Sequence, residues 1–256
     1  MKQFNVFMRK EFTELFRTGK AALLLIVYSI FGIMNPAQAK LTPWMLSLMS
    51  ESLADQGVVI GSMTVNALTA WTQYFKNMFM EYVLALALFC GIFSTEFQSG
   101  TLINILTKGL ARWKTVAAKW VVMLACWSVC YWLTFGITFG YSAYFWSNAN
   151  LSGLMFSVFC SYVLGIWLLS VELAFSAFFR SGIYALIGTG AIYAAAYALG
   201  VIPALSAWLP VRLDSSFSLL TGALASADFT VALCIAAILS VLNVALAIAA
   251  FQKKRL

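Results

Sequence analysis

Six apolar segments, each near the length of a membrane-crossing helix, constrain this chain more than any other feature. A helix needs about 20 predominantly apolar residues to cross the hydrocarbon core of a bilayer. The chain is 62% hydrophobic and only 10% charged, which is too little charge to cover a water-facing surface. We therefore predict an all-α integral membrane protein with a single transmembrane domain over residues 1–256. The expected spans are Ala21–Ala39, Tyr74–Thr95, Trp120–Phe145, Gly153–Phe179, Ile183–Ile202 and Phe229–Phe251.

The basic residues are distributed unevenly between the two sides that these spans define. With the N-terminus on the cytoplasmic side, only Lys40, Lys76 and Arg212 of the 16 basic residues fall on the outer side. Cytoplasmic loops of membrane proteins carry an excess of Lys and Arg. The pattern predicts that both termini are cytoplasmic. Because most basic residues then face the anionic headgroups of the cytoplasmic leaflet, the net charge of +7 does not indicate nucleic acid as a partner.

The chain has few groups suited to catalysis or metal binding. It contains no histidine, so histidine acid–base chemistry and histidine metal ligation are excluded. Its five cysteines lie in apolar segments, where a free thiol packs as a small hydrophobic group. The pattern G-x-x-x-x-G-K-[ST], which cradles nucleotide phosphates, does not occur. We predict no catalytic residue, no metal site and no cofactor bound by this chain.

The N-terminal segment, residues 1–19, has a helical period before the first span begins. Its apolar side chains gather on one face, and its charged side chains lie on the other. A helix of this kind lies along a membrane surface. We expect an interfacial helix on the cytoplasmic leaflet. The side chains of its apolar face are Phe4, Phe7, Met8, Phe12, Leu15 and Phe16.

The cytoplasmic connector between the second and third spans, residues 96–119, combines basic residues with a short amphipathic helix. Glu96 lies where the second span is expected to leave the membrane, and the sequence Phe97–Gly100 interrupts the helix. The Thr101 side chain can then cap a new helix, which Gly109 ends. A helix outside the membrane with an exposed apolar face requires a partner. That face consists of Leu102, Ile105 and Leu106.

Two outer segments are also too apolar for free loops. We expect residues 203–228 to form short re-entrant helices in the outer leaflet, because irregular backbone at that depth must be buried in protein or face a wet cavity. The long outer connection Lys40–Phe75 is expected to hold a short amphipathic segment around Trp44 that rests on the outer interface.

The connector resembles that of the ABC-2 type permeases, which are the membrane subunits of one class of ABC transporters. The resemblance rests on the pattern Glu-x-x-x-Gly-Thr formed by Glu96, Gly100 and Thr101, and on the basic residues that follow it. The interfacial helix, the six spans and the outer re-entrant segment fit the layout of that family over the whole chain. One departure is Gly109, where many members have a proline, and we expect it to loosen the turn.

The resemblance implies that the short helix of the connector is a coupling helix, which docks on a separate ATPase subunit carrying ATP and Mg²⁺. It also implies a second permease copy, identical or homologous, and a place in the cytoplasmic (plasma) membrane of a bacterium. Glu96 is expected to brace the hinge by bonding to the backbone of the connector or by pairing with Arg9 or Arg17. The docking and coupling residues are Glu96, Gly100, Thr101, Leu102, Ile105, Leu106, Lys108 and Arg112.

Few charged residues lie within the spans, and Glu172 lies deepest. A buried acid in a membrane is costly and is often functional, so Glu172 either pairs with a basic side chain of a neighbouring helix or contacts cargo or a proton. Glu81 is expected nearer the outer surface. By family analogy the second and fifth spans line the transport path, and aromatic residues there suit an amphipathic or apolar cargo as well as ordinary packing. The candidate path residues are Glu81, Tyr82, Glu172, Tyr193 and Tyr197.

The resulting hypothesis is the permease subunit of an ATP-driven ABC exporter, which moves a peptide, toxin or drug by alternating access. A secondary transporter or channel would predict an internal repeat and several charges within the membrane, and neither is evident. An intramembrane enzyme would need a convergent set of catalytic groups, which the chain lacks. A permease-like immunity or sensor protein shares the same architecture and stays open as an alternative.

Overall fold

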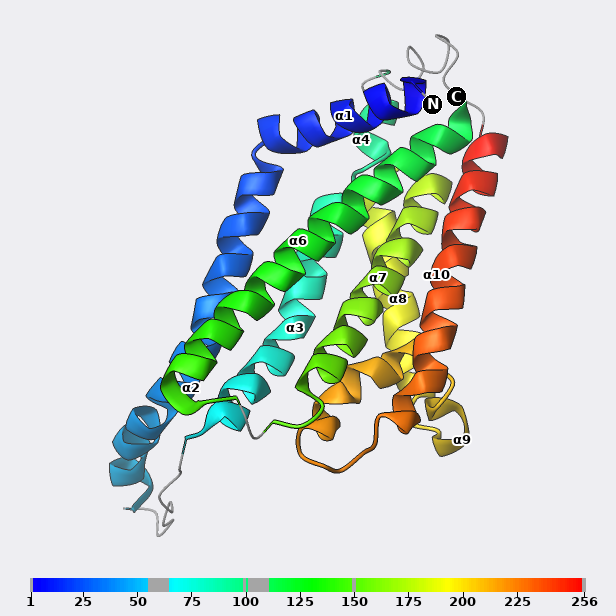
Figure 1. Ribbon diagram of the computed structural model, residues 1–256. Helices are drawn as coiled ribbons and strands as arrows, with labels where there is room; N and C mark the ends of the chain where they lie inside the picture. The colour runs from blue at the N-terminus through cyan, green and yellow to red at the C-terminus, as the bar shows by residue number, and fades with distance from the viewer. Residues whose placement is uncertain (1, 55–64, 99, 101–110, 149–150, 255–256) are drawn as a thin grey trace.

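The computed structural model describes residues 2–54, 65–98, 100, 111–148 and 151–254. In this part of the chain all regular secondary structure is helical, as predicted. Figure 1 shows a bundle of long helices with both ends of the chain at one end of it, where a separate helix, α1 (Lys2–Arg17), lies across the bundle. We call this end the α1 end.

Six helical segments of the described chain are long and apolar enough to cross a membrane, which confirms the predicted number of spans. They contain the helices α2 (Lys20–Ala54), α3 (Ala67–Phe89), α6 (Arg112–Trp146), α7 (Leu154–Phe178), α8 (Gly182–Leu199) and α10 (Ala227–Lys253). The shorter elements are α4 (Ser94–Gln98), α9 (Pro203–Ser206) and the 3₁₀ helix η1 (Pro210–Leu219).

Helix α7 forms the centre of the bundle and is the most buried span. Its contact with α6 depends on Gly165, because a Cβ atom at this position would lie 2.2 Å from the indole ring of Trp127. Trp127 in turn packs against Tyr28 of α2 and Tyr82 of α3. A single close approach thus brings the aromatic side chains of three helices together around α7.

Helix α2 is longer than predicted, because it continues through residues 40–54 instead of ending near Ala39. The short amphipathic segment expected around Trp44 is therefore not separate from the first span, since Trp44 belongs to the same helix. Its position at the outer interface stays a prediction. The helix also passes through Pro36, which cannot donate a hydrogen bond to the carbonyl group of Gly32. The Thr138 hydroxyl of α6 donates to this carbonyl at 3.1 Å. Such side-chain donors allow proline inside membrane helices.

The second span breaks earlier than the predicted interruption at residues 97–100. Helix α3 ends at Phe89, and the chain turns before α4 begins at Ser94. The turn lies directly against the α7–α8 connection, where a Cβ atom on Gly182 would come within 2.7 Å of the Cys90 carbonyl oxygen. The Ser176 hydroxyl of α7 also donates to that oxygen at 3.4 Å. This tertiary contact fixes the position of the break.

The predicted connector is also too long at its far side. Helix α6 begins at Arg112, so residues 112–119 belong to the third membrane-length helix. Gly100, which follows α4, has a φ of +68°, a conformation that glycine adopts without a steric penalty. Positions 101–110, which include the predicted coupling helix, lie outside the described residues.

The segment before α10 forms short helices, as expected, and η1 folds back against α7. The Ser157 hydroxyl donates to the Ser216 carbonyl oxygen at 2.8 Å, and the Ser216 hydroxyl donates to the Ser157 carbonyl oxygen at 3.1 Å. Both serines are fully buried. These reciprocal hydrogen bonds join η1 to α7 and pair polar groups that are buried in the protein. Re-entry of this segment into the outer leaflet stays a prediction.

Candidate functional site

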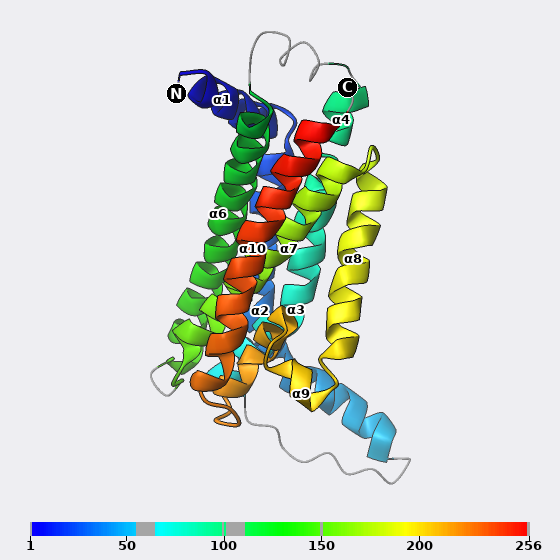
Figure 2. The same cartoon turned by 90° about the vertical axis from the view of Figure 1, so that its right-hand side faces the viewer.

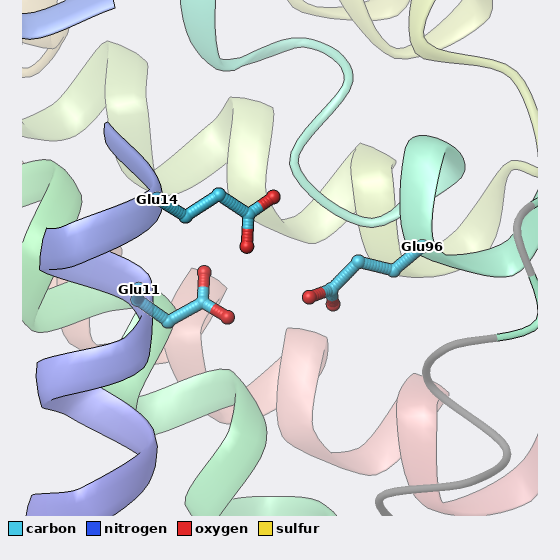
Figure 3. Close-up of side chains that lie close together, drawn as sticks. All are labelled: Glu11, Glu14 and Glu96. Atoms are coloured by element: carbon cyan, nitrogen blue, oxygen red, sulfur yellow. The ribbon is translucent and has the colours of Figure 1, made fainter. Parts of the chain in front are cut away.

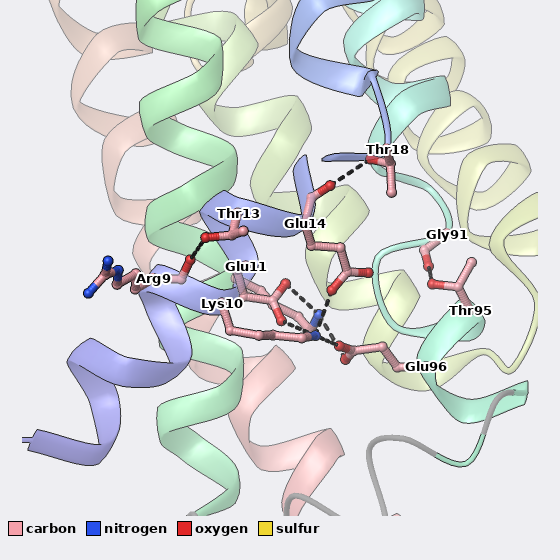
Figure 4. A network of polar contacts seen from close by, with 10 residues as sticks. Arg9, Lys10, Glu11, Thr13, Glu14, Thr18, Gly91, Thr95 and Glu96 are labelled. Carbon is pink, nitrogen blue, oxygen red and sulfur yellow. Dashed lines mark hydrogen bonds and ion pairs between the residues drawn. The ribbon is translucent and has the colours of Figure 1, made fainter. Parts of the chain in front are cut away.

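Five charged side chains meet at the α1 end, where α1, α4 and the first turns of α6 come together. We call this cluster the charged junction. Glu11 and Glu14 of α1 and Glu96 of α4 point toward one another (Figure 3). Lys10 of α1 and Lys119 of α6 bind these carboxylates, and Figure 4 shows the contacts of this network.

The most buried part of the charged junction is centred on Lys119. Its Nζ atom lies 2.9 Å from Glu11 Oε2 and 2.9 Å from Glu96 Oε2. The side chains of Lys119, Glu96 and Glu11 are only 2%, 5% and 8% exposed. A charge buried to this degree is costly unless it is paired, so these contacts position the three helix segments relative to one another.

Lys10 closes the charged junction from its exposed side. Its ammonium group contacts Glu11 at 3.0 Å and Glu14 at 2.7 Å, and it also pairs with Glu96. Burial alone would lower the pKa of Lys10, but the carboxylates of Glu14, Glu96 and Glu11 outweigh this effect and raise the pKa above its usual range. Lys10 is therefore held in its charged form.

The sequence of α1 explains how Glu11 reaches the charged junction. Phe7 is buried against Ala118 of α6, with Phe4 and Met8 beside it. Glu11 lies one helical turn beyond Phe7 on the same face, so packing of the aromatic residues carries its carboxylate to Lys119. Phe16, which we expected on this face, is instead 64% exposed, and Phe12 is only partly buried.

Glu96 pairs with a cation of the N-terminal helix, but with Lys10 and not with the expected Arg9 or Arg17. Its second partner, Lys119, was expected to face lipid headgroups and is buried instead. The missed signal is a lysine that directly follows three apolar or small residues, Val116–Ala118. Glu11 was also missed, although a carboxylate one turn after Phe7 on the apolar face indicates that it pairs inside the protein.

The three glutamates have the spacing of metal ligands, because their carboxylates offer one oxygen each within 4.8 Å of one another. In this structure the two lysine ammonium groups contact the same carboxylates. The arrangement is therefore accounted for as an ion-pair network, and it supplies positioning and charge compensation.

The C-terminal end of α10 anchors both sides of the connector. Arg112, the first residue of α6, donates to the carbonyl oxygens of Gln252 and Lys254 at 2.8 and 2.9 Å. On the other side, the Phe97 ring of α4 packs at a tilt against the Phe251 ring, with ring centres 6.0 Å apart, and the Lys254 ammonium group lies 4.2 Å from the Phe97 ring centre. Residues 101–110 are thus bracketed by two anchored ends.

Lys254 also caps the C-terminal end of α7. Its ammonium group donates to the carbonyl oxygens of Ala177 and Phe179, each at 2.9 Å. Burial and the nearby positive charge of Arg180 lower the pKa of Lys254 to about 8.

Three of the eight predicted coupling residues lie in the described structure. Glu96 belongs to the charged junction, Arg112 binds the C-terminal end of α10, and Gly100 lies just after α4. The other five lie outside the described residues, so their role stays a prediction. They are Thr101, Leu102, Ile105, Leu106 and Lys108.

Three of the five candidate path residues line one cavity of about 770 Å³. Tyr82 comes from α3, and Tyr193 and Tyr197 come from α8, which lies at the edge of the bundle (Figure 2). Glu81 and Glu172 do not line it. Glu81 lies in the middle of α3, deeper than expected, and is fully buried. Glu172 accepts a 2.6 Å hydrogen bond from Thr189 of α8 in place of an expected basic partner.

Comparison with known proteins agrees with this architecture. The model of a family described as ABC-2 family transporter protein matches residues 6–256, which is nearly the whole chain. A search of curated proteins found no match. With a family match of this extent and six membrane-length helices, the chain belongs to the ABC-2 family of transporter proteins, as a multi-pass membrane permease.

Proposed function

We propose that this chain is the permease of an ATP-driven exporter and that the charged junction couples its spans to a separate ATPase subunit. The observation that supports this proposal most is the position of the ion pairs. Glu96 precedes residues 101–110, Lys119 follows them, and both contact α1. A force applied to this connector would therefore be transmitted to α1, α4 and α6 together.

In this mechanism, binding of ATP and Mg²⁺ moves the ATPase subunits, and the connector moves with them as a lever. The buried ion pairs keep the ends of the lever fixed to the spans, because separating Lys119 from Glu96 or Glu11 would leave a charge buried without a partner. A second permease copy faces the first, and the spans alternate between inward and outward access. The cavity beside α8 is mainly lined by apolar and aromatic side chains, which suits an amphipathic or hydrophobic cargo.

The partner is tested by photo-cross-linking in native membranes. A photoreactive amino acid at Ile105 is expected to capture an ATPase subunit, which mass spectrometry of the cross-linked product identifies. The matched control carries the same amino acid at Ile238 of α10, which is 59% exposed in the middle of a span and is expected to give no such product. Capture from neither position, or from both equally, would contradict docking through the connector.

The direction of transport is tested in proteoliposomes that contain the permease and its ATPase. ATP added outside reaches only complexes whose ATPase faces outward. An exporter is then expected to accumulate cargo inside the liposomes, and release of preloaded cargo would show import instead.

A further inference from the structure

The cavity between α3 and α8 is apolar over most of its lining and has a carboxylate at its border. Its volume of about 770 Å³ is that of a site for a small organic molecule. Among the described residues that line it, Asp214 of η1 is the only charged one. An acid at an apolar cavity is costly unless a counter-charge or a donor compensates it.

Within the part of the chain that the structure describes, no ion pair includes Asp214. The ion pairs of the described residues all lie at the α1 end of the bundle. Arg212, two residues away on η1, places its guanidinium carbon 5.7 Å from the ring centre of Phe229 on α10. Burial raises the pKa of Asp214, and the nearby Tyr193 hydroxyl, which favours the ionised carboxylate, offsets this only in part. A bound cation would remove this cost by stabilising the ionised carboxylate.

Aromatic rings continue the site from Asp214 into the cavity. Tyr193 lies between Phe79 and Tyr197, with ring centres 6.3 Å from each. The faces of such rings attract organic cations, and the attraction is strongest where water is excluded. A smaller cavity of about 330 Å³ adjoins this end and shares Tyr197 and Asp214. It is also lined by Arg212, Ser206 and Ser215, so the carboxylate lies where apolar and polar surroundings meet.

We propose that this cavity binds cationic amphiphiles, with the apolar or aromatic body between α3 and α8 and the cationic group beside Asp214 and Tyr193. The proposal names the cargo class of the exporter proposed above. It rests on that function only for the transport step, because binding requires the permease alone.

Two ions of the same shape and opposite charge test the role of the carboxylate. Purified permease in nanodiscs of uncharged lipid is titrated with tetraphenylphosphonium and with tetraphenylborate, and binding to empty nanodiscs is subtracted. The permease is expected to prefer the cation by about tenfold or more. Asp214→Asn should remove this preference. Asp228→Asn is the matched control, because Asp228 is an exposed acid at the same end of the bundle, outside both cavities.

Two glycines test the location of the site. A Cβ atom at Gly190 would meet no atom within 4 Å, and Gly190 lines the cavity. Gly190→Leu is therefore expected to fill the cavity and abolish binding of both ions without destabilising α8. Gly136 of α6 is equally open and lies outside the cavity, so Gly136→Leu should bind both ions as the unmodified protein does.

Equal binding of the two ions by the unmodified protein would overturn the proposal, as would an unchanged preference in Asp214→Asn. Equal effects of the two leucine substitutions would place the site elsewhere. Because these assays contain neither ATPase nor ATP, cation binding without ATP-driven transport would refute the exporter and leave the site intact. ATP-driven transport by a permease that shows no preference for the cation would refute the site alone.

Discussion

The two ends of the bundle are held together by different interactions. At the α1 end, helices that are distant in the sequence are joined by charged groups, with Lys119 buried between Glu11 and Glu96. At the opposite end, η1 is fixed by neutral hydrogen bonds between Ser157 and Ser216. Neutral hydrogen bonds are individually weak, whereas breaking a buried ion pair leaves an uncompensated charge. The α1 end is thus suited to transmitting force, and the opposite end to local rearrangement around a ligand.

The largest effect should follow from loss of the buried lysine. Lys119→Met leaves Glu11 and Glu96 buried with only Lys10 to compensate them, and we expect it to reduce the free energy of unfolding by about 3–5 kcal/mol. Thermal unfolding in detergent measures this loss. Lys114→Met removes a lysine on the same helix that lies over the Trp113 ring and forms no ion pair with the described residues, and it should have little effect.

A double substitution sharpens the test of the charged junction. If the loss arises from unpaired carboxylates, Glu11→Gln combined with Lys119→Met should cost less than the sum of the two single substitutions. Additive costs would mean that the two residues do not interact.

The next effect concerns packing in the middle of the bundle, between the two ends. Gly165→Ala would place a methyl group 2.2 Å from the Trp127 ring, so the tryptophan or the helix must move. We expect a cost of about 1–3 kcal/mol, as for other overpacked cores. Gly140→Ala, where a Cβ atom meets nothing within 4 Å, should be neutral or slightly stabilising in the same unfolding assay. Similar stability of the two variants would show that the close contact of α6 and α7 is wrong.

A smaller effect is expected at the opposite end. Ser216→Ala removes the donor to the Ser157 carbonyl oxygen, which should cost about 1 kcal/mol. Ser215→Ala serves as the control, because it removes an exposed hydroxyl that donates to the Arg212 carbonyl oxygen within the same helix. The comparison between the two ends fails if Ser216→Ala destabilises the protein as much as Lys119→Met does.

The smallest effect is the pH dependence that Lys254 contributes. Its pKa is lowered from 10.5 to about 8, so between these values the unfolded chain binds more protons than the folded protein. Stability should therefore rise with pH across this interval. Unfolding measured from pH 8 to 10.5 should show a smaller rise for Lys254→Met, whereas the exposed neighbour variant Lys253→Met should keep it. An identical pH profile for both variants would contradict the assignment to Lys254.

Long periodic features could be predicted from the sequence. The six spans and the N-terminal helix follow from runs of apolar residues and from a helical period, which need no knowledge of neighbouring helices. The segment before α10 was also recognised as short helices, because it is too apolar and too rich in proline for a free loop.

Features that depend on tertiary contacts could not be predicted. Helix α2 continues past Pro36 because Thr138 of another helix satisfies the freed carbonyl group. The break after Phe89 depends on the close approach of Gly182. A cation of the N-terminal helix was predicted as a partner of Glu96, but Lys10 was not identified and Lys119 was not expected, since only the folded structure brings them to it. Asp214 gave no signal, because its cavity forms only when η1 folds back toward α8.

The most direct test of the proposed coupling compares two glutamates of the charged junction in proteoliposomes with the ATPase. Glu96 is buried and pairs with lysines from two helices, whereas Glu14 is exposed and, among the described residues, forms an ion pair only with Lys10. The quantity measured is cargo moved per ATP hydrolysed. We expect Glu96→Gln to keep ATP hydrolysis and to reduce this ratio about tenfold, and Glu14→Gln to leave it nearly unchanged. An unchanged ratio in Glu96→Gln, with protein of normal stability, would contradict coupling through the charged junction.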